Sequence, residues 1–343
     1  MTARTKPLPR RVPVNLFGIP FGLAGLGEVW TTLARYGSAP ALVGEALLLL
    51  SAAVWLVLVL GYLRHLLARP RTVGADLRDP VAAPFASLVV ITPMVLAGQG
   101  LSPHAALAAQ VVTDTFLTLT VLLGGWFTGQ WLYRPLDIDR FHPGYFLPTV
   151  AGGLIAAAAA GTVGQPRLGE IMLGLGGLCW ILLGSVILGR LLLGPVLPPP
   201  LQPTLAIEVA PPAVASLAWF ALRGDRIDVV AAVLAGYGLL MVLAQLPLLP
   251  VYLRLPFMPS TWSFTFSWAA VVTVALIWLQ DGQPAGYRAW QFLLAAAISL
   301  LVAGIALRTA VALVRRQLLP PRPSANAPAG QAAVLIGAGA PES

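Results

Sequence analysis

The chain has few charged residues and almost no cysteine. Only 10% of its 343 residues are charged, whereas roughly 25% is usual in a soluble chain. The single cysteine, Cys179, excludes an internal disulfide framework and a cysteine-based metal cluster. Residues 1–13 carry four basic residues but no apolar core before a cleavage site, so we expect no cleavable signal peptide. With 58% hydrophobic residues and a mean hydropathy of +0.83, the composition predicts an integral membrane protein.

Apolar runs predict an all-α membrane protein with ten transmembrane helices, since about 20 mostly apolar residues cross a bilayer. The runs lie at about 15–34, 41–63, 81–101, 104–132, 143–162, 169–194, 203–222, 228–252, 258–279 and 287–314. An even number of spans places both termini on one side. A cytoplasmic N-terminus assigns 16 of the 21 Lys and Arg residues to the inside segments, as the positive-inside bias requires. We therefore expect a multi-pass protein of the plasma (inner) membrane with both termini cytoplasmic.

This topology also explains the net charge of +8. The basic residues are scattered over short loops and termini, so we expect the lipid bilayer as a partner and no nucleic acid. The predicted domains are a cytoplasmic segment at 1–14, a transmembrane domain at 15–319 and a tail at 320–343. The tail is rich in Pro, Ala and Gly and has few large apolar residues, which predicts disorder.

The odd-numbered spans begin about 60 residues apart, which suggests five helical hairpins in tandem. Proline marks the odd spans: Pro20, Pro84, Pro93, Pro148, Pro203, Pro211 and Pro212. Proline removes a helical hydrogen bond, and in lipid the freed carbonyl needs protein or water as a partner. We therefore expect an inner ring of five kinked odd helices around a central pore and an outer ring of five even helices. The alternative is that the prolines only accommodate irregular packing.

The ninth span begins with an unusual alternation of hydroxyl and aromatic side chains. Its sequence is MPSTWSFTFSWAAVVTVALIWL, from Met258 to Leu279. Hydroxyls can bond to the carbonyl one turn back and are tolerated in a span. Such a segment fits either the wall of a narrow uncharged passage or a seam between helices with aromatic filler. One face of this helix carries Trp262, Phe266, Ala270 and Thr273. Along this face the side chains change from large aromatic groups to small ones.

Four strings in the odd spans resemble the tellurite-resistance/C4-dicarboxylate transporter family, which includes the bacterial TehA proteins and the plant slow-type anion channels. They are NLFGIPFGLAGLG (Asn15–Gly27), PGYFLPTVAGG (Pro143–Gly153), LQPTLAIEVAPPAVASLAW (Leu201–Trp219) and WSFTFSW (Trp262–Trp268). Each string alone is weak, but four in order across the spans are specific. The resemblance implies an anion channel or channel-like transporter, usually a homotrimer with one pore per protomer.

The resemblance also implies that a phenylalanine of the ninth span plugs the pore. The matching residue is Phe266, and Ser267 stands where the family usually has proline. Phe264 lies about 200° away around the helix and would be the plug if the helix were rotated. An aromatic ring in a narrow apolar bore blocks ions by sterics and dewetting. The expected pore-lining and kink residues are Pro20, Pro93, Pro148, Pro211, Pro212, Trp262 and Thr273.

No Lys or Arg lies in the middle of an odd span, so selectivity would depend on helix-end dipoles, hydroxyls and a basic cytoplasmic mouth. A weak field favours anions that lose water easily. We therefore predict a gated channel for small monovalent anions that prefers nitrate to chloride.

Three acids, Glu28, Asp114 and Glu208, lie within or near spans and are functional candidates. We expect Glu208, four residues before Pro212, either to bond the backbone freed by the prolines or to act as a proton-coupling carboxylate. The second role would make the protein a coupled carrier of C4-dicarboxylate, sulfite or tellurite-type oxyanions. Asp114 fits a contact between helices or subunits.

The sequence gives no support for an enzyme. Its three histidines are too scattered for a ligand set, and it has no phosphate-binding Gly-x-x-x-x-Gly-Lys loop. We expect no catalytic residue, no metal and no cofactor.

Overall fold

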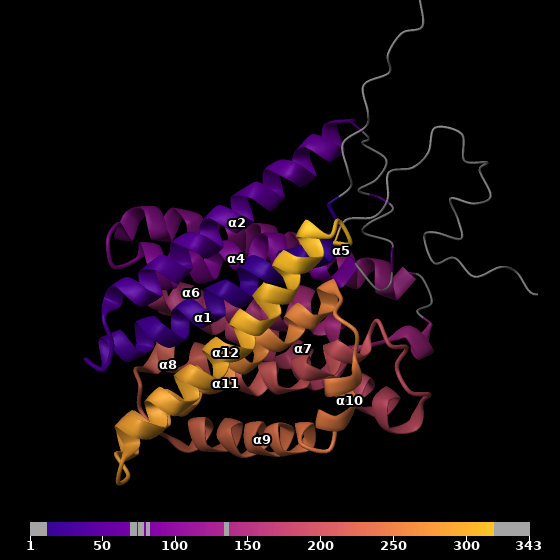
Figure 1. Ribbon diagram of the computed structural model, residues 1–343. Helices are drawn as coiled ribbons and strands as arrows, with labels where there is room; N and C mark the ends of the chain where they lie inside the picture. Colours follow the sequence, from indigo (N-terminus) through magenta and orange to yellow (C-terminus); the bar gives the residue numbers. More distant parts are fainter. Residues whose placement is uncertain (1–11, 69–73, 75–78, 80–82, 134–136, 319–343) are drawn as a thin grey trace, which may run out of the picture.

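The computed structural model describes residues 12–68, 74, 79, 83–133 and 137–318, and these residues form helices joined by short connections. Figure 1 shows the helices running side by side, with α9 along one edge of the bundle. The α-helices are α1 (Gly18–Arg35), α2 (Ala41–Ala68), α4 (Leu88–Leu96), α5 (Ala106–Tyr133), α6 (Gly152–Thr162), α7 (Pro166–Leu193), α8 (Ala210–Arg223), α9 (Val229–Gln245), α10 (Leu249–Arg254), α11 (Ser263–Gly282) and α12 (Tyr287–Val314).

Nine helical segments of the described chain are long and apolar enough to cross a membrane. The all-helical membrane fold is therefore confirmed. The eighth expected span, at 228–252, is shorter and broken: the 17-residue α9 is followed by a turn and by α10. Pro247 in the turn and Pro250 near the start of α10 cannot donate the backbone hydrogen bonds of a continuing helix.

The four long even helices, α2, α5, α7 and α12, are uninterrupted and 28 residues long. Only 11–28% of their most apolar stretches is buried inside the protein. Because their exposed side chains are mostly large and apolar, these helices present surfaces suited to lipid.

The odd segments differ in both burial and shape. They are Val14–Arg35, Ala83–Leu101, Pro143–Thr162, Gln202–Arg223 and Pro259–Gly282. In each of them, 61–83% of the most apolar stretch is buried. Each combines an α-helix with at least one 3₁₀ or π turn. Buried position and irregular backbone thus occur in the same five segments.

Proline explains much of this irregularity. Pro93 lies inside α4, which passes into a π turn at Ala97–Leu101. Pro148 lies within the π turn Leu147–Ala151 that precedes α6. The missing proline N–H at each place removes an α-helical hydrogen bond, and a wider turn accommodates the change. In contrast, α11 is continuous from Ser263 through Ser267 to Gly282.

Parts of the predicted terminal domains lie outside the described residues. Residues 1–11 belong to the expected N-terminal segment and residues 319–343 contain the expected disordered tail, so both domain boundaries stay predictions.

Candidate functional site

A cavity with about 570 Å³ of empty space lies among the odd segments. All five contribute side chains to its wall, for example Phe21 from α1, Leu88 from α4, Val150 before α6, Val214 from α8 and Phe266 from α11. No residue of α2, α5, α7, α9 or α12 lines it. The same segments that are buried and irregular therefore enclose one common space, which we call the first cavity.

The wall of the first cavity is apolar with three polar side chains. Among the described residues that line it, Asn15, Ser263 and Ser267 are polar and none is ionisable. The Asn15 Oδ1 and Ser263 Oγ atoms are buried and have no hydrogen-bond partner among the described residues. A buried hydroxyl or amide without a partner costs free energy, so these two residues of the wall retain unused hydrogen-bonding capacity.

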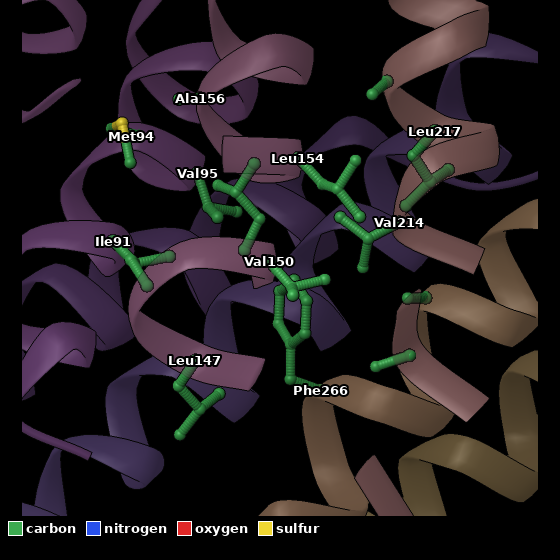
Figure 2. Packing of buried hydrophobic residues seen from close by; sticks show 14 of the residues in the cluster. Ile91, Met94, Val95, Leu147, Val150, Leu154, Ala156, Val214, Leu217 and Phe266 are labelled. Atoms are coloured by element: carbon green, nitrogen blue, oxygen red, sulfur yellow. The ribbon is translucent and has the colours of Figure 1, made fainter. Parts of the chain in front are cut away.

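Phe266 lies at the inner end of this space. Its side chain is buried, with 5% exposure, and its ring stacks on that of Phe21, with centroids 3.7 Å apart and planes inclined by 16°. Figure 2 shows the ring pointing from α11 toward Val150 and Val214, with Leu147 and Leu154 nearby. The ring is therefore surrounded by side chains from several odd segments.

A glycine face on α1 allows α11 to approach closely enough for this contact. A Cβ atom at Gly18 would lie 3.0 Å from Trp262 Cβ, and one at Gly25 would lie 2.9 Å from Phe266 Cδ2. At Gly22, between them, a Cβ would overlap the Thr265 hydroxyl. Side chains at these positions would push α11 outward, so the glycines determine where the Phe266 ring lies.

Phe264 has a different environment. Its ring meets the ring of Tyr252 edge to face, with centroids 4.8 Å apart, and it does not line the first cavity. Trp262 does line the cavity, while its Nε1 donates a hydrogen bond to Thr309 Oγ1 on α12 at 2.9 Å. The tryptophan thus anchors the start of α11.

The other sequence-predicted residues are distributed around the cavity. Pro211 lines it, whereas Pro20, Pro93, Pro148, Pro212 and Thr273 do not. The Pro20 carbonyl accepts a hydrogen bond from the Ser51 hydroxyl of α2 at 2.6 Å, and the Pro212 carbonyl accepts one from Ser216 at 2.9 Å. The Thr273 hydroxyl donates to the Ala269 carbonyl at 3.0 Å. Side chains therefore satisfy the carbonyls of Pro20 and Pro212.

A second cavity, with about 340 Å³ of empty space, lies farther along the bundle. Its wall comes from α1, α4, the following π turn, α6 and α8, and Val214 lines both cavities. Glu28 and Gln99 are on this wall, and the Gln99 amide Nε2 donates a hydrogen bond to Glu28 Oε1 at 3.0 Å. An intramembrane carboxyl group therefore lines this space.

Glu208 lines neither cavity. It lies in the 3₁₀ segment Gln202–Val209, and its Oε1 atom is buried without a hydrogen-bond partner among the described residues. It lies near Tyr237 of α9 and Tyr252 of α10. This carboxyl group therefore lies on the side of its segment that packs toward the broken eighth span.

Sequence reasoning did not identify Phe21 or the Glu28–Gln99 pair as parts of this site. Phe21 lies in the NLFGIPFGLAGLG string, and the sequence makes Glu28 a functional candidate as an acid near a span but does not indicate Gln99 as its partner. The spacing of Gly18, Gly22 and Gly25 was the available signal, because it makes one side of α1 smooth enough for a neighbouring helix.

Residues 11–310 match the SLAC1 family, described as voltage-dependent anion channels. The chain belongs to this family of membrane anion channels, and its class is therefore a channel rather than an enzyme. A more particular likeness is to a protein of Haemophilus influenzae (strain Rd), named tellurite resistance protein TehA homolog. The two sequences are 29% identical over 282 residues, which cover 79% of this chain and 82% of that protein. The resemblance seen in the sequence strings is thus confirmed.

Proposed function

We propose that the chain forms a gated pore for small anions, that the pore runs through the two cavities, and that the Phe266 ring closes it. The observation that carries the proposal is the first cavity, because every odd segment contributes to its wall and no long even helix does. Phe266 is the candidate for the gate because its ring lies at the inner end of that cavity, among side chains of neighbouring segments.

The same observation supports the proposed architecture. An inner ring of five irregular segments would surround the pore, and an outer ring of straight helices would separate it from lipid. The burial contrast between the two groups supports this arrangement, because lipid-facing helices expose apolar side chains while the inner ones are enclosed by protein. Five tandem hairpins in a single domain at 15–319 would generate the alternation.

The proposed selectivity follows from the chemistry of the wall. Hydroxyl and amide groups provide weak, uncharged hydrogen-bond donors. None of the described residues that line the first cavity carries a fixed positive charge. Such a wall replaces only part of an anion's hydration shell, so the cost of dehydration dominates selectivity. Anions that lose water easily are then favoured.

We therefore expect nitrate to be more permeant than chloride. The protein would be reconstituted into planar bilayers with nitrate on one side and chloride on the other, and the reversal potential measured. A reversal potential that reports nitrate preference supports the proposed wall chemistry. Equal permeability, or a preference for chloride, would contradict it.

The orientation and assembly are also proposals. Basic residues are in excess in the loops and termini on the side of the membrane where the N-terminus lies. This excess supports cytoplasmic termini in the plasma (inner) membrane. Labelling of single cysteines placed in the loops would test this orientation. The family resemblance supports a homotrimer. The mass of the purified particle, corrected for detergent, would distinguish a trimer from a monomer.

The second candidate function is a proton-coupled carrier, and the unpartnered Glu208 carboxyl group is the observation that favours it. If Glu208 couples proton movement to transport, uptake of a C4-dicarboxylate, sulfite or tellurite-type oxyanion into vesicles requires a pH gradient. Glu208→Gln then abolishes the dependence on the gradient. Uptake that is unchanged by the gradient and by the substitution would support a passive channel.

A further inference from the structure

The second cavity contains a feature that the proposed gate does not use. Among the described residues that line it, Glu28 is the only ionisable one, and the polar side chains are those of Glu28, Gln99 and Thr162. The Glu28 side chain belongs to a residue that is only 8% exposed. The remaining wall is apolar and includes Met94, Val95, Ile155, Val214 and Leu217.

We propose that the Glu28 carboxyl group is the charge-selectivity element of the second cavity, which admits anions readily only when that group is protonated. This inference rests on the proposed function, because it requires anions to pass from the first cavity into the second. The structure places the two cavities next to each other, since Val214 lines both.

The electrostatics of the site support this role. A carboxylate in an enclosed, apolar space is poorly screened, so its repulsion of a nearby anion is much stronger than in bulk water. Protonation removes the negative charge and supplies an O–H group that can donate a hydrogen bond to an anion. The Gln99 amide, which has a second N–H, lies beside it and provides a further donor.

The Gln99 contact fixes the carboxyl group in this position. Gln99 belongs to the π turn Ala97–Leu101, and its Nε2 atom lies 3.0 Å from Glu28 Oε1. The Thr162 hydroxyl donates a hydrogen bond to the Ala158 carbonyl at 2.9 Å. Its O–H group is therefore not free to donate a hydrogen bond to an anion. Glu28 and Gln99 are therefore the groups that decide whether the space attracts or repels an anion.

Charged side chains also lie near the C-terminal end of α1, but none of those named below lines the second cavity. On α1 itself, Arg35 lies 3.8 Å from Asp225, which follows α8. Between α2 and the turn after the π segment, Glu45 lies 3.7 Å from His104. The neighbouring ends also carry Arg223 on α8, Asp281 on α11 and Arg288 on α12. Of these groups, His104 can lose or gain a positive charge with a change of protonation beside Glu45, so it needs a control.

The experiment uses Phe266→Ala as background, so that the gate does not limit the current. Anion currents are recorded in planar bilayers while the pH is varied on the side where Arg35 and Thr162 lie. With Glu28 present, we expect conductance to rise by about tenfold or more as the pH is lowered. Glu28→Gln removes the charge and retains an acceptor for Gln99, so its conductance is expected to be high at every pH.

Two matched variants separate Glu28 from its surroundings. Glu45→Gln removes another carboxylate at the same end of the bundle, and His104→Gln removes the imidazole that lies beside it. Neither residue lines the cavity. Both are expected to retain the pH dependence. The decisive comparison is between Phe266→Ala alone and the double variant that also carries Glu28→Gln. If the conductance of the double variant still responds to pH as that of Phe266→Ala does, the inference is overturned.

A second measurement does not depend on the gate. The infrared band of the protonated carboxyl group is followed in purified protein, and the band missing from Glu28→Gln is assigned to Glu28. Because linkage is reciprocal, a tenfold effect of protonation on nitrate binding raises the pH midpoint of this band by about one unit when nitrate is saturating. An unchanged midpoint overturns the inference. A shift in the midpoint without any increase in current for Phe266→Ala would support the Glu28 site and contradict Phe266 as the gate.

Discussion

Phe266→Ala should increase anion conductance by at least about tenfold, which corresponds to about 1.4 kcal/mol less barrier. The substitution removes the benzyl group at the inner end of the first cavity, where the ring excludes ions both by its volume and by keeping the space dry. Wild-type and variant channels would be reconstituted at equal protein density and compared by their macroscopic currents in symmetrical nitrate.

Phe264→Ala is the matched control for this measurement. It removes the same group two residues earlier, where the ring contacts Tyr252 rather than the cavity. We expect its conductance to equal that of the wild type. Truncating a buried phenylalanine such as Phe266 costs about 3–5 kcal/mol of stability. Phe264 is only partly buried, and both variants are checked for folding by size-exclusion profile and melting temperature. If Phe266→Ala does not fold, Phe266→Leu is used instead. Leucine keeps most of the side-chain volume but lacks the aromatic ring, so its current shows whether the ring itself closes the pore. An unchanged current in a folded variant would show that Phe266 is not the gate.

The alternation of buried and exposed segments follows from the sequence because its cause is local. Proline inside a span removes a helical hydrogen bond and disturbs the regular backbone around it, whereas an uninterrupted apolar run such as that of α2 makes a straight helix. The break between α9 and α10 follows from Pro247 and Pro250 by the same argument, so the expectation of a continuous span at 228–252 gave these prolines too little weight.

The interior of the site depends on how neighbouring helices align, which no local pattern specifies. Helical periodicity puts Trp262, Phe266, Ala270 and Thr273 on one face. The first cavity reaches Trp262, just before α11, but within α11 it reaches only the first turns, at Ser263, Phe266 and Ser267. Beyond Phe266, Ala270 and Thr273 are packed in the protein interior. Periodicity predicts the direction of a side chain, whereas the neighbours decide where a cavity ends.

The Phe21–Phe266 stack is a clear example of such a contact. Its partners lie in the first and ninth spans, and it exists because the glycine face of α1 allows α11 to approach. From the sequence alone, Phe21 is one of several aromatic residues in an apolar helix. The structure shows its place in the site, because the centroid of its ring lies 3.7 Å from that of the Phe266 ring, the candidate gate.

This stack predicts that Phe21 stabilises the closed position of the gate. An aromatic pair contributes about 0.5–1.5 kcal/mol beyond the area it buries, so Phe21→Leu should raise the open probability about 2- to 10-fold while keeping most of the side-chain volume. Single-channel recording measures open probability directly. Phe17→Leu is the control, because Phe17 is a buried phenylalanine one turn earlier that contacts Tyr62 instead.

A double-mutant cycle separates this role from a direct block by Phe21. If Phe21 acts only by holding the Phe266 ring, adding Phe21→Leu to Phe266→Ala produces no further increase in conductance, because the ring that it stabilises has been removed. If Phe21 itself obstructs the pore, the two effects are additive in free energy. Additivity would therefore assign the closure of the pore to two independent rings, one on α1 and one on α11, and would contradict a gate formed by Phe266 alone.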